Sequence, residues 1–287
     1  MSGKNKILLI GVNGQLGSDL VKILENVVPI THKDLEICDT KQLKLVVEEH
    51  NPQTIINTSA FHKVDLCEDE VEKSFQVNAY AVRDLALICK EMNILLVHFS
   101  TDYIFDGRKN TPYIEDDSPN PLNVYGVSKL AGEYFIRNIS NRFLIIRTSG
   151  LYGSAGSSGK GGNFIETMLR LAREEKPIKV VNDQVLTPTY TKDLAENIKD
   201  LLNSQELGIF HITNNGHCSW FEFAEEIFKL ADFKPDLAPT TTEDFGAKAL
   251  RPAYSVLENH RLKEVGLDSM SQWRDALKRY MIEKGHI

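Results

Sequence analysis

The stretch that decides the fold is KILLIGVNGQLG, residues 6–17. Its first half, residues 6–10, is a short apolar run that suits a strand buried on both faces. Its second half is rich in glycine and leads into a helical pattern of apolar residues, which continues to Leu24. A strand, a glycine-rich turn and a helix in this order are typical of the first βαβ unit of a dinucleotide-binding domain.

The glycines of this stretch give the motif its chemistry. Gly11, Gly14 and Gly17 would allow a tight turn and a close approach of the backbone to a pyrophosphate. The N–H groups at the start of the following helix would hold that pyrophosphate. The alternative is a turn whose glycines serve packing only. The strand before and the helix after favour dinucleotide binding.

The segment after the second expected strand bears on the choice of cofactor. That strand, residues 27–30, contains Pro29, which indicates an irregular or edge-like strand. An NAD-specific site usually has an acid at the end of this strand. Here the chain continues Thr31-His32-Lys33, and Asp34 comes only later. We therefore expect NADPH as the cofactor, with NADH possible. The alternative is that His32 and Lys33 are ordinary solvated loop residues.

The rest of the chain predicts an α/β protein with a Rossmann-type, doubly wound parallel sheet. Asp39 or Thr40 is expected to cap the helix at 42–50. Further strands are expected at 54–57, 94–99, 143–148 and 209–212, and further helices at 79–92, 125–137 and 193–202. We expect residues 1–152 to form the NAD(P)-binding domain, with a return segment at about 188–212.

The character of the chain changes after residue 148. Glycines at 150, 153, 156, 159, 161 and 162 predict a loop near the substrate. Helices are expected at 163–175, 220–231 (capped by Ser219), 258–265 and 272–282, with a short strand at 178–181. We expect residues 153–187 and 213–287 to form a smaller C-terminal substrate-binding lobe, interwoven with the first domain.

Composition excludes several classes of protein. The net charge of −7 argues against a nucleic-acid-binding surface, which needs a basic stripe. The four cysteines show no C-x-x-C spacing, so we expect neither a zinc site nor a disulfide framework. No segment reaches the roughly 18 apolar residues of a membrane span, and the first residues lack the apolar run of a signal peptide. We expect a cytoplasmic protein, monomeric or homodimeric, with no nucleic-acid or membrane partner.

Three residues form a candidate proton-transfer group. Tyr125 and Lys129 lie four apart in an expected helix and therefore share one face. A lysine ammonium there can lower the pKa of the tyrosine from about 10, so that it exchanges a proton near neutral pH. Such a pair is common on exposed helices, and a hydroxyl at a strand end, here Thr101, is by itself an ordinary turn former. After a nucleotide-binding unit, the three together indicate carbonyl reduction.

The sequence resembles the extended short-chain dehydrogenase/reductase family and, within it, the dTDP-4-dehydrorhamnose reductases. The resemblance covers nearly the whole chain and rests above all on GVNGQLG at 11–17, STDYIFDG at 100–107 and PLNVYGVSKLAGE at 121–133. It implies NAD(P)H-dependent reduction of the C4 ketone of a nucleotide-linked 4-keto-6-deoxy sugar. The expected case is conversion of dTDP-4-dehydro-L-rhamnose to dTDP-L-rhamnose.

The resemblance also implies a role for each matching residue. Tyr125 would protonate the C4 oxygen, Lys129 would hold the nicotinamide ribose, and Thr101 would hydrogen-bond the same oxygen. Besides Tyr125 and Lys129, the implied cofactor-binding residues are Gly11, Gly14, Gln15, Leu16, Gly17, His32, Asp39, Thr40, Ala60, Phe61 and His62. The implied substrate-binding residues are Thr101, Asp102, Gly150, Asn163 and Arg251, and no metal site is predicted.

The chain departs from the family pattern at three positions. Gly150 stands where members commonly carry tryptophan, Leu186 where a glycine is expected, and Thr31 where many carry an acid. Two alternatives stay open. The first is a nucleotide-sugar epimerase or dehydratase, although a dehydratase needs an acid pair and Thr101 is followed by Asp102 alone. The second is a non-catalytic regulatory subunit on the same fold, as in the beta subunit of methionine adenosyltransferase.

Overall fold

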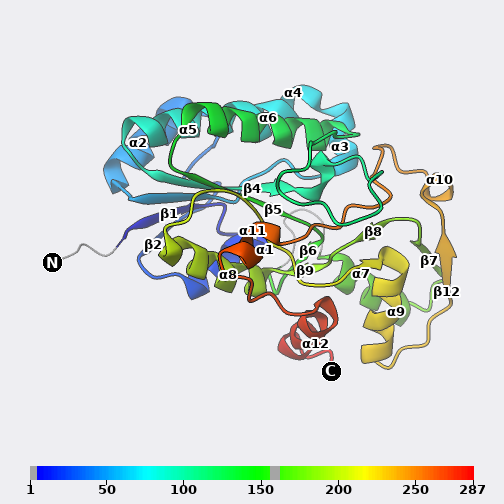
Figure 1. Cartoon of the computed structure of the whole chain (residues 1–287). Coiled ribbons are helices and arrows are strands. Elements are labelled where there is room, and N and C mark those ends of the chain that lie inside the picture. The colour runs from blue at the N-terminus through cyan, green and yellow to red at the C-terminus, as the bar shows by residue number, and fades with distance from the viewer. Residues whose placement is uncertain (1–4, 156–161) are drawn as a thin grey trace.

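A six-stranded sheet organises the computed structural model, which describes residues 5–155 and 162–287 (Figure 1). The strand order is β10-β5-β4-β3-β1-β2, and every neighbouring pair is parallel. The order changes direction between β1 and β3, which is where doubly wound sheets bind ligands. The predicted fold class is confirmed, and Pro29 lies in the edge strand. The strands are β1 (Ile7–Ile10), β2 (Val27–Ile30), β3 (Thr54–Asn57), β4 (Leu95–Thr101), β5 (Phe143–Thr148) and β10 (Gly208–His211).

Helices cover both faces of this sheet (Figure 1). Successive side chains of β1 point to opposite faces, so Ile7 and Leu9 join one core cluster and Leu8 and Ile10 the other. The first face is covered by α1 (Gln15–Ile23), α8 (Thr191–Ser204) and α11 (His260–Glu264). The second is covered by α2 (Thr40–His50), α5 (Ala81–Glu91) and α6 (Val124–Ile139).

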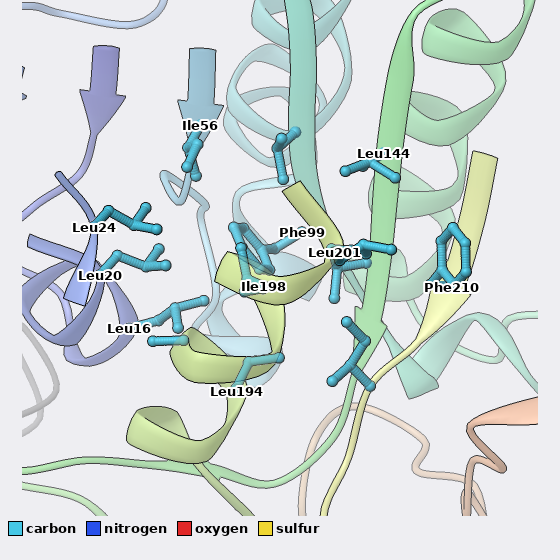
Figure 2. Close-up of a cluster of buried hydrophobic side chains, with 14 of the residues drawn as sticks. Leu16, Leu20, Leu24, Ile56, Phe99, Leu144, Leu194, Ile198, Leu201 and Phe210 are labelled. Carbon is cyan, nitrogen blue, oxygen red and sulfur yellow. The ribbon is translucent and has the colours of Figure 1, made fainter. Parts of the chain in front are cut away.

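Figure 2 shows the core on the first face, where the chain returns to the sheet after the glycine-rich loop. Side chains of α1 and α8 meet residues of β3, β4, β5 and β10, and all are buried: Leu16, Leu20, Leu194, Ile198, Leu201, Ile56, Phe99, Leu144 and Phe210. Leu262 and Met270 belong to the same cluster, although they lie in the range predicted for the lobe. The division of the chain into two domains therefore stays a prediction.

A smaller lobe lies beyond the carboxyl end of β5 (Figure 1). Its core joins α7, α9 and α12, with the stacked rings of Tyr152 and Tyr190 5.6 Å apart at their centre. Ser219 caps α9 in a capping box with Glu222, as expected. The lobe's elements are β6 (Leu151–Tyr152), α7 (Phe164–Arg173), β7 (Ile178–Val181), β8 (Val185–Leu186), β9 (Thr189–Tyr190), β11 (Cys218–Ser219), α9 (Trp220–Leu230), β12 (Leu237–Thr240), α10 (Thr242–Phe245) and α12 (Trp273–Glu283).

Several short elements were not expected from the sequence. β6 interrupts the predicted loop, whose positions 156, 159 and 161 lie outside the described residues, and β6 pairs with β9. Strands of two residues carry no periodic signal, so their pairing depends on tertiary contacts. The helix expected at 79–92 begins as a π-helix at Gln76–Tyr80, preceded by α3 (Val64–Asp69) and α4 (Val71–Phe75). None of the described helices is long and apolar enough to cross a membrane.

Candidate active site

A cavity of about 1030 Å³ opens at the carboxyl ends of β1, β3, β4 and β5. Its wall comes from the glycine-rich turn before α1, from the strand ends together with α6, and from the lobe. It lies beside the change of strand direction, where a doubly wound sheet leaves a crevice. The sheet and the lobe thus enclose one site between them.

The glycine-rich turn packs closely on the start of α1 and leaves the first N–H groups of that helix without a capping side chain. A Cβ on Gly17 would lie 2.4 Å from the carbonyl oxygen of Gly11, so the helix and the turn could not come this close with any other residue. Gly11 has φ +89°, which favours glycine. Gly14 precedes α1 without a capping side chain, and the first turn carries no acid. The N–H groups there suit the pyrophosphate of a dinucleotide.

Most of the predicted cofactor residues meet at this cavity. Its wall includes Gly11, Gly14, Gln15, Leu16, Gly17, His32, Ala60, His62, Tyr125 and Lys129. Asp39, Thr40 and Phe61 are not part of it. Asp39 caps α2 by accepting from Lys41 N and Gln42 N, and Thr40 donates to Asp84 at 2.6 Å. Phe61 bonds Asn78 through its backbone. The cavity wall gives no support for a cofactor contact of these three.

The start of α6 fixes the position of Tyr125. Asn123 caps this helix by accepting from Gly126 N at 2.8 Å. A Cβ on Gly126 would lie 2.2 Å from the carbonyl oxygen of Tyr103, so the helix presses directly on the segment after β4. As a result Tyr125 is held half-buried at the cavity wall, and its hydroxyl group is hydrogen-bonded to Thr101. Thr101, Tyr125 and Lys129 all line the cavity.

The predicted lowering of the Tyr125 pKa by Lys129 is wrong for this structure. Burial raises the pKa of Tyr125, and the charge of Asp102 adds to the rise, while the hydrogen bond to Thr101 opposes it. Burial also lowers the pKa of Lys129 to about 8, against the opposing charge of Glu133. Lys129 Nζ lies 3.2 Å from His98 Nε2. Tyr125 is therefore a neutral phenol at neutral pH, ready to donate a proton.

Asp102 supplies a buried carboxyl group to the cavity wall. It accepts hydrogen bonds from Ser149 at 2.9 Å and from Thr101 at 3.1 Å, and Ser255 also bonds it. Burial nevertheless raises the pKa of Asp102 to about 6. Two further hydroxyl groups in the wall, Ser100 Oγ and Thr148 Oγ1, are buried and have no hydrogen-bond partner within the described part of the chain. Such groups are suited to bind a ligand.

Two of the departures from the family pattern meet in space. Gly150 has φ +56°, and a Cβ there would lie 2.9 Å from Leu186 Cδ1 and 3.0 Å from the carbonyl oxygen of Thr187. Leu186 thus occupies the space that a side chain at position 150 would enter. Both residues line the cavity, and so does Trp220, which packs on Phe164 with 4.7 Å between ring centres.

The remaining predicted substrate residues differ in position. Asn163 lines the cavity, caps α7 and donates to the Tyr280 hydroxyl at 2.9 Å. Arg251 does not line the cavity. It forms an ion pair with Asp65 at 2.9 Å and a hydrogen bond with Tyr103, which itself borders the cavity. Any influence of Arg251 on the site would therefore pass through Tyr103.

Sequence reasoning missed the polar residues beneath α6. His98 and Asn57 are buried there in strands that otherwise read as apolar, and Glu133 is buried on α6 itself. A histidine inside such a strand is the one signal that could have drawn attention to them. Among the residues that the structure describes, no group of three or more His, Cys, Asp or Glu gathers in a way that could hold a metal ion.

Comparison with known proteins gives consistent matches over the whole chain. The model of the family described as RmlD substrate binding domain matches residues 5–285. The spore coat polysaccharide biosynthesis protein SpsK of Bacillus subtilis is 40% identical over 283 residues, covering 97% of this chain and 98% of the relative. A dTDP-4-keto-6-deoxy-D-glucose reductase of Streptomyces niveus is 37% identical over 276 residues, covering 94% of each. The crystal structure of a dTDP-4-dehydrorhamnose reductase from Bacillus anthracis in complex with NADP superposes with a TM-score of 0.93 at 40% identity, covering 98% of this chain and 99% of that one.

Proposed function

The chain belongs to the RmlD substrate-binding domain family, and from that premise we propose that it is an NADPH-dependent reductase of a dTDP-linked 4-keto-6-deoxy sugar. The expected reaction converts dTDP-4-dehydro-L-rhamnose to dTDP-L-rhamnose, with NADH as a possible second donor. The observation that carries the proposal is one cavity that holds Tyr125, Thr101 and Lys129 beside the uncapped start of α1.

The residues present fit a nicotinamide dinucleotide. The first turn of α1 offers N–H groups to the pyrophosphate, and the close packing of Gly17 on Gly11 brings that turn to the cavity wall without an intervening side chain. At the other end, the free hydroxyl groups of Ser100 and Thr148 can hydrogen-bond the nicotinamide half. The presence of Thr31 rather than an acid directly after β2, together with His32 in the wall, favours NADPH.

The side chains around Tyr125 can then complete the reduction. The cofactor, when bound, supplies the hydride. Tyr125 donates its proton to the C4 oxygen, because burial keeps the phenol neutral until the oxygen gains charge. Thr101 holds the same oxygen through its hydroxyl group, and Lys129 binds the nicotinamide ribose. Asp102 accepts a hydrogen bond from a sugar hydroxyl and so orients the ring.

A substrate panel tests this proposal. The purified protein would be mixed with NADPH and either dTDP-4-dehydro-L-rhamnose or dTDP-4-keto-6-deoxy-D-glucose, with consumption followed by absorbance and product configuration by NMR. Consumption with the first compound supports the proposal, and consumption with the second alone corrects the sugar. Stoichiometric bound NAD⁺ with no net consumption would support the epimerase or dehydratase alternative. Cofactor binding without turnover on any 4-keto sugar nucleotide would support the regulatory subunit.

We also propose that the protein works in the reducing cytoplasm as a monomer or homodimer. The four cysteines support the first part, since all are free and three of them are buried. Size-exclusion chromatography with light scattering would test the second part.

A further inference from the structure

A chain of three buried polar side chains crosses the sheet beneath α6. Asn57 of β3 and His98 of β4 are direct partners in the parallel register, and Lys129 reaches them from the helix. Asn57 Nδ2 lies 3.3 Å from His98 Nδ1, and Lys129 Nζ lies 3.2 Å from His98 Nε2. All three side chains are at most 2% exposed. The only member at the cavity wall is Lys129.

The orientation of the Asn57 amide is fixed by Ser59. The backbone N–H of Ser59 donates to Asn57 Oδ1 at 3.0 Å, and the Ser59 hydroxyl contacts the same atom at 2.5 Å. A backbone N–H can only donate, so the atom it contacts must be the amide oxygen. The NH₂ group of Asn57 therefore faces His98.

This orientation determines the tautomer of His98. The Asn57 NH₂ group can only donate, so Nδ1 of His98 must accept and carries no proton. Burial and the charge of Lys129 lower the pKa of His98 far below its ordinary value, so the ring is neutral. A neutral imidazole has one N–H, which then lies on Nε2 and points at Lys129 Nζ. An ammonium group has no lone pair to accept it, whereas an amine does.

We infer that His98 stabilises the amine form of Lys129 and holds it at the cavity wall, which makes His98 a positioning residue for the reaction. The inference rests on the proposed function in one respect, namely that Lys129 binds the cofactor's ribose. Burial acts in the same direction, since it lowers the pKa of Lys129 to about 8.

The other charged and titratable groups near Lys129 do not provide an alternative proton acceptor. Glu133, on the same helix, raises the pKa of Lys129, but its carboxylate is bound by Arg147 of β5 at 2.7 Å. Tyr125, also on α6, is a neutral phenol because its pKa is raised. The further titratable groups that act on Tyr125 are Asp102, Tyr103 and Cys67.

The consequence is a proton taken up when the cofactor binds. At a pH near or above 8, Lys129 starts as an amine that accepts from His98. When Nζ turns toward the ribose, it takes one proton from the solvent and becomes an ammonium, while His98 keeps its Nε2–H. No other covalent bond changes, and the hydrogen bond from His98 Nε2 to Nζ is lost. His98 thus makes cofactor affinity depend on pH in this range.

The tautomer of His98 can be measured directly in the cofactor-free protein. Long-range ¹H–¹⁵N NMR of the histidine rings distinguishes a protonated Nε2 from a protonated Nδ1, and the signal missing in His98→Gln assigns the ring. The expected result is a neutral ring protonated at Nε2. A ring protonated at Nδ1 would overturn the inference, whether or not the protein proves to be a reductase.

Two variants then test the effect on Lys129. Asn57→Asp places an acceptor against Nδ1, which moves the proton there and lets Nε2 accept from an ammonium. His98→Gln offers a carbonyl oxygen to the ammonium. Both should raise the pKa of Lys129 by about one unit, a tenfold change in proton affinity. The measurement is NMR titration of ¹³C-labelled lysine, with Lys129→Met identifying the signal.

His211→Gln is the matched control. His211 is also fully buried in the sheet, but its ring lies beside Arg147 at 3.5 Å. Proton uptake on NADPH binding, measured calorimetrically in two buffers near pH 8, should fall in Asn57→Asp and His98→Gln and stay unchanged in His211→Gln. Equal uptake in all of them would show that His98 only fills space. If His98→Gln fails to fold, Asn57→Asp still decides the matter, because the ring whose proton moves from Nε2 to Nδ1 in that variant is His98 and its signal is thereby assigned.

Discussion

Lys129 and Glu133 lie one turn apart on α6 and reach the same face of the sheet, yet they meet opposite surroundings. Glu133 accepts three hydrogen bonds of 2.7–3.2 Å from Arg147, which also donates to the Glu115 carbonyl at 3.2 Å. Lys129 has a neutral histidine 3.2 Å away. A buried charge with a full set of partners belongs to the structure, whereas one without them, at the wall of a cavity, is typical of a functional site.

The two histidines in these groups sharpen the contrast. His98 pairs in register with Asn57, and His211 with Arg147, both on the face that α6 covers. Burial lowers the pKa of each ring far below its ordinary value. The two buried histidines therefore differ in their cationic partner: Lys129 beside His98 lines the cavity, whereas Arg147 beside His211 does not.

The largest expected effect comes from a change in the cavity group around Lys129, at Tyr125, the proposed proton donor. Tyr125→Phe removes the proton donor and should lower kcat by about 10²–10⁴-fold. The Kd for NADPH and the unfolding midpoint should stay nearly unchanged, because the ring still fills its site. Steady-state kinetics with the sugar nucleotide, together with cofactor titration, measure this. Turnover close to wild type would show that another group is the acid.

Removing one partner of the buried ion pair between Glu133 and Arg147 should instead lower the stability of the fold. Glu133→Ala leaves Arg147 buried and unpaired, and we expect a loss of about 3–5 kcal/mol in the free energy of unfolding. Urea denaturation measures it. The double variant Glu133→Leu/Arg147→Met removes both charges and should recover most of the loss. A single variant as stable as wild type would contradict the assignment of this pair to the structure.

The pH dependence of stability should distinguish Lys129, whose pKa is lowered, from the ion-paired Arg147. Lys129 has a pKa of about 8 when folded and an ordinary value of 10.5. Between these values the unfolded chain holds a proton that the folded chain has lost, so Lys129 makes stability rise with pH. Its contribution amounts to about 3 kcal/mol over the full range.

Lys129→Met removes this contribution, so the variant should exceed wild type in stability at neutral pH, and the difference should shrink between pH 8 and 10. Taking the difference between the two proteins cancels the titration of Tyr125 and the cysteines. Denaturation at several pH values measures it. A pH-independent difference would mean that Lys129 titrates as an ordinary lysine.

The smallest effect is expected at an exposed ion pair. Its contribution to stability is the reference against which the buried groups of Lys129 and Glu133 are compared. Lys44 of α2 lies 3.2 Å from Glu91 of α5, and both side chains are well exposed. Lys44→Ala should change the free energy of unfolding by less than about 1 kcal/mol. If Lys44→Ala lowered the free energy of unfolding as much as Glu133→Ala does, burial would not explain why the Glu133–Arg147 pair matters for stability.

The fold and the placement of Tyr125 and Lys129 side by side at one cavity could be predicted because their signals are local. Apolar runs marked every strand of the main sheet, and the spacing of Tyr125 and Lys129 placed them on one helix face. The direction of the Tyr125 pKa could not be predicted, since it depends on burial depth and on where Lys129 Nζ points. The pairing of Asn57 with His98 depends on register between strands 41 residues apart.

The contact between Gly150 and Leu186 restricts how this site can change over evolutionary time. The Cβ of a tryptophan at position 150 would come within 2.9 Å of Leu186 Cδ1 and 3.0 Å of the Thr187 carbonyl oxygen, on a backbone with φ +56°. A change to tryptophan there alone should therefore be disfavoured, whereas Leu186→Gly first would remove the side-chain contact and leave only the backbone to adjust. Positions 150 and 186 are thus linked in this chain, and a tryptophan at position 150 is expected to be tolerated better after the loss of the Leu186 side chain than before it.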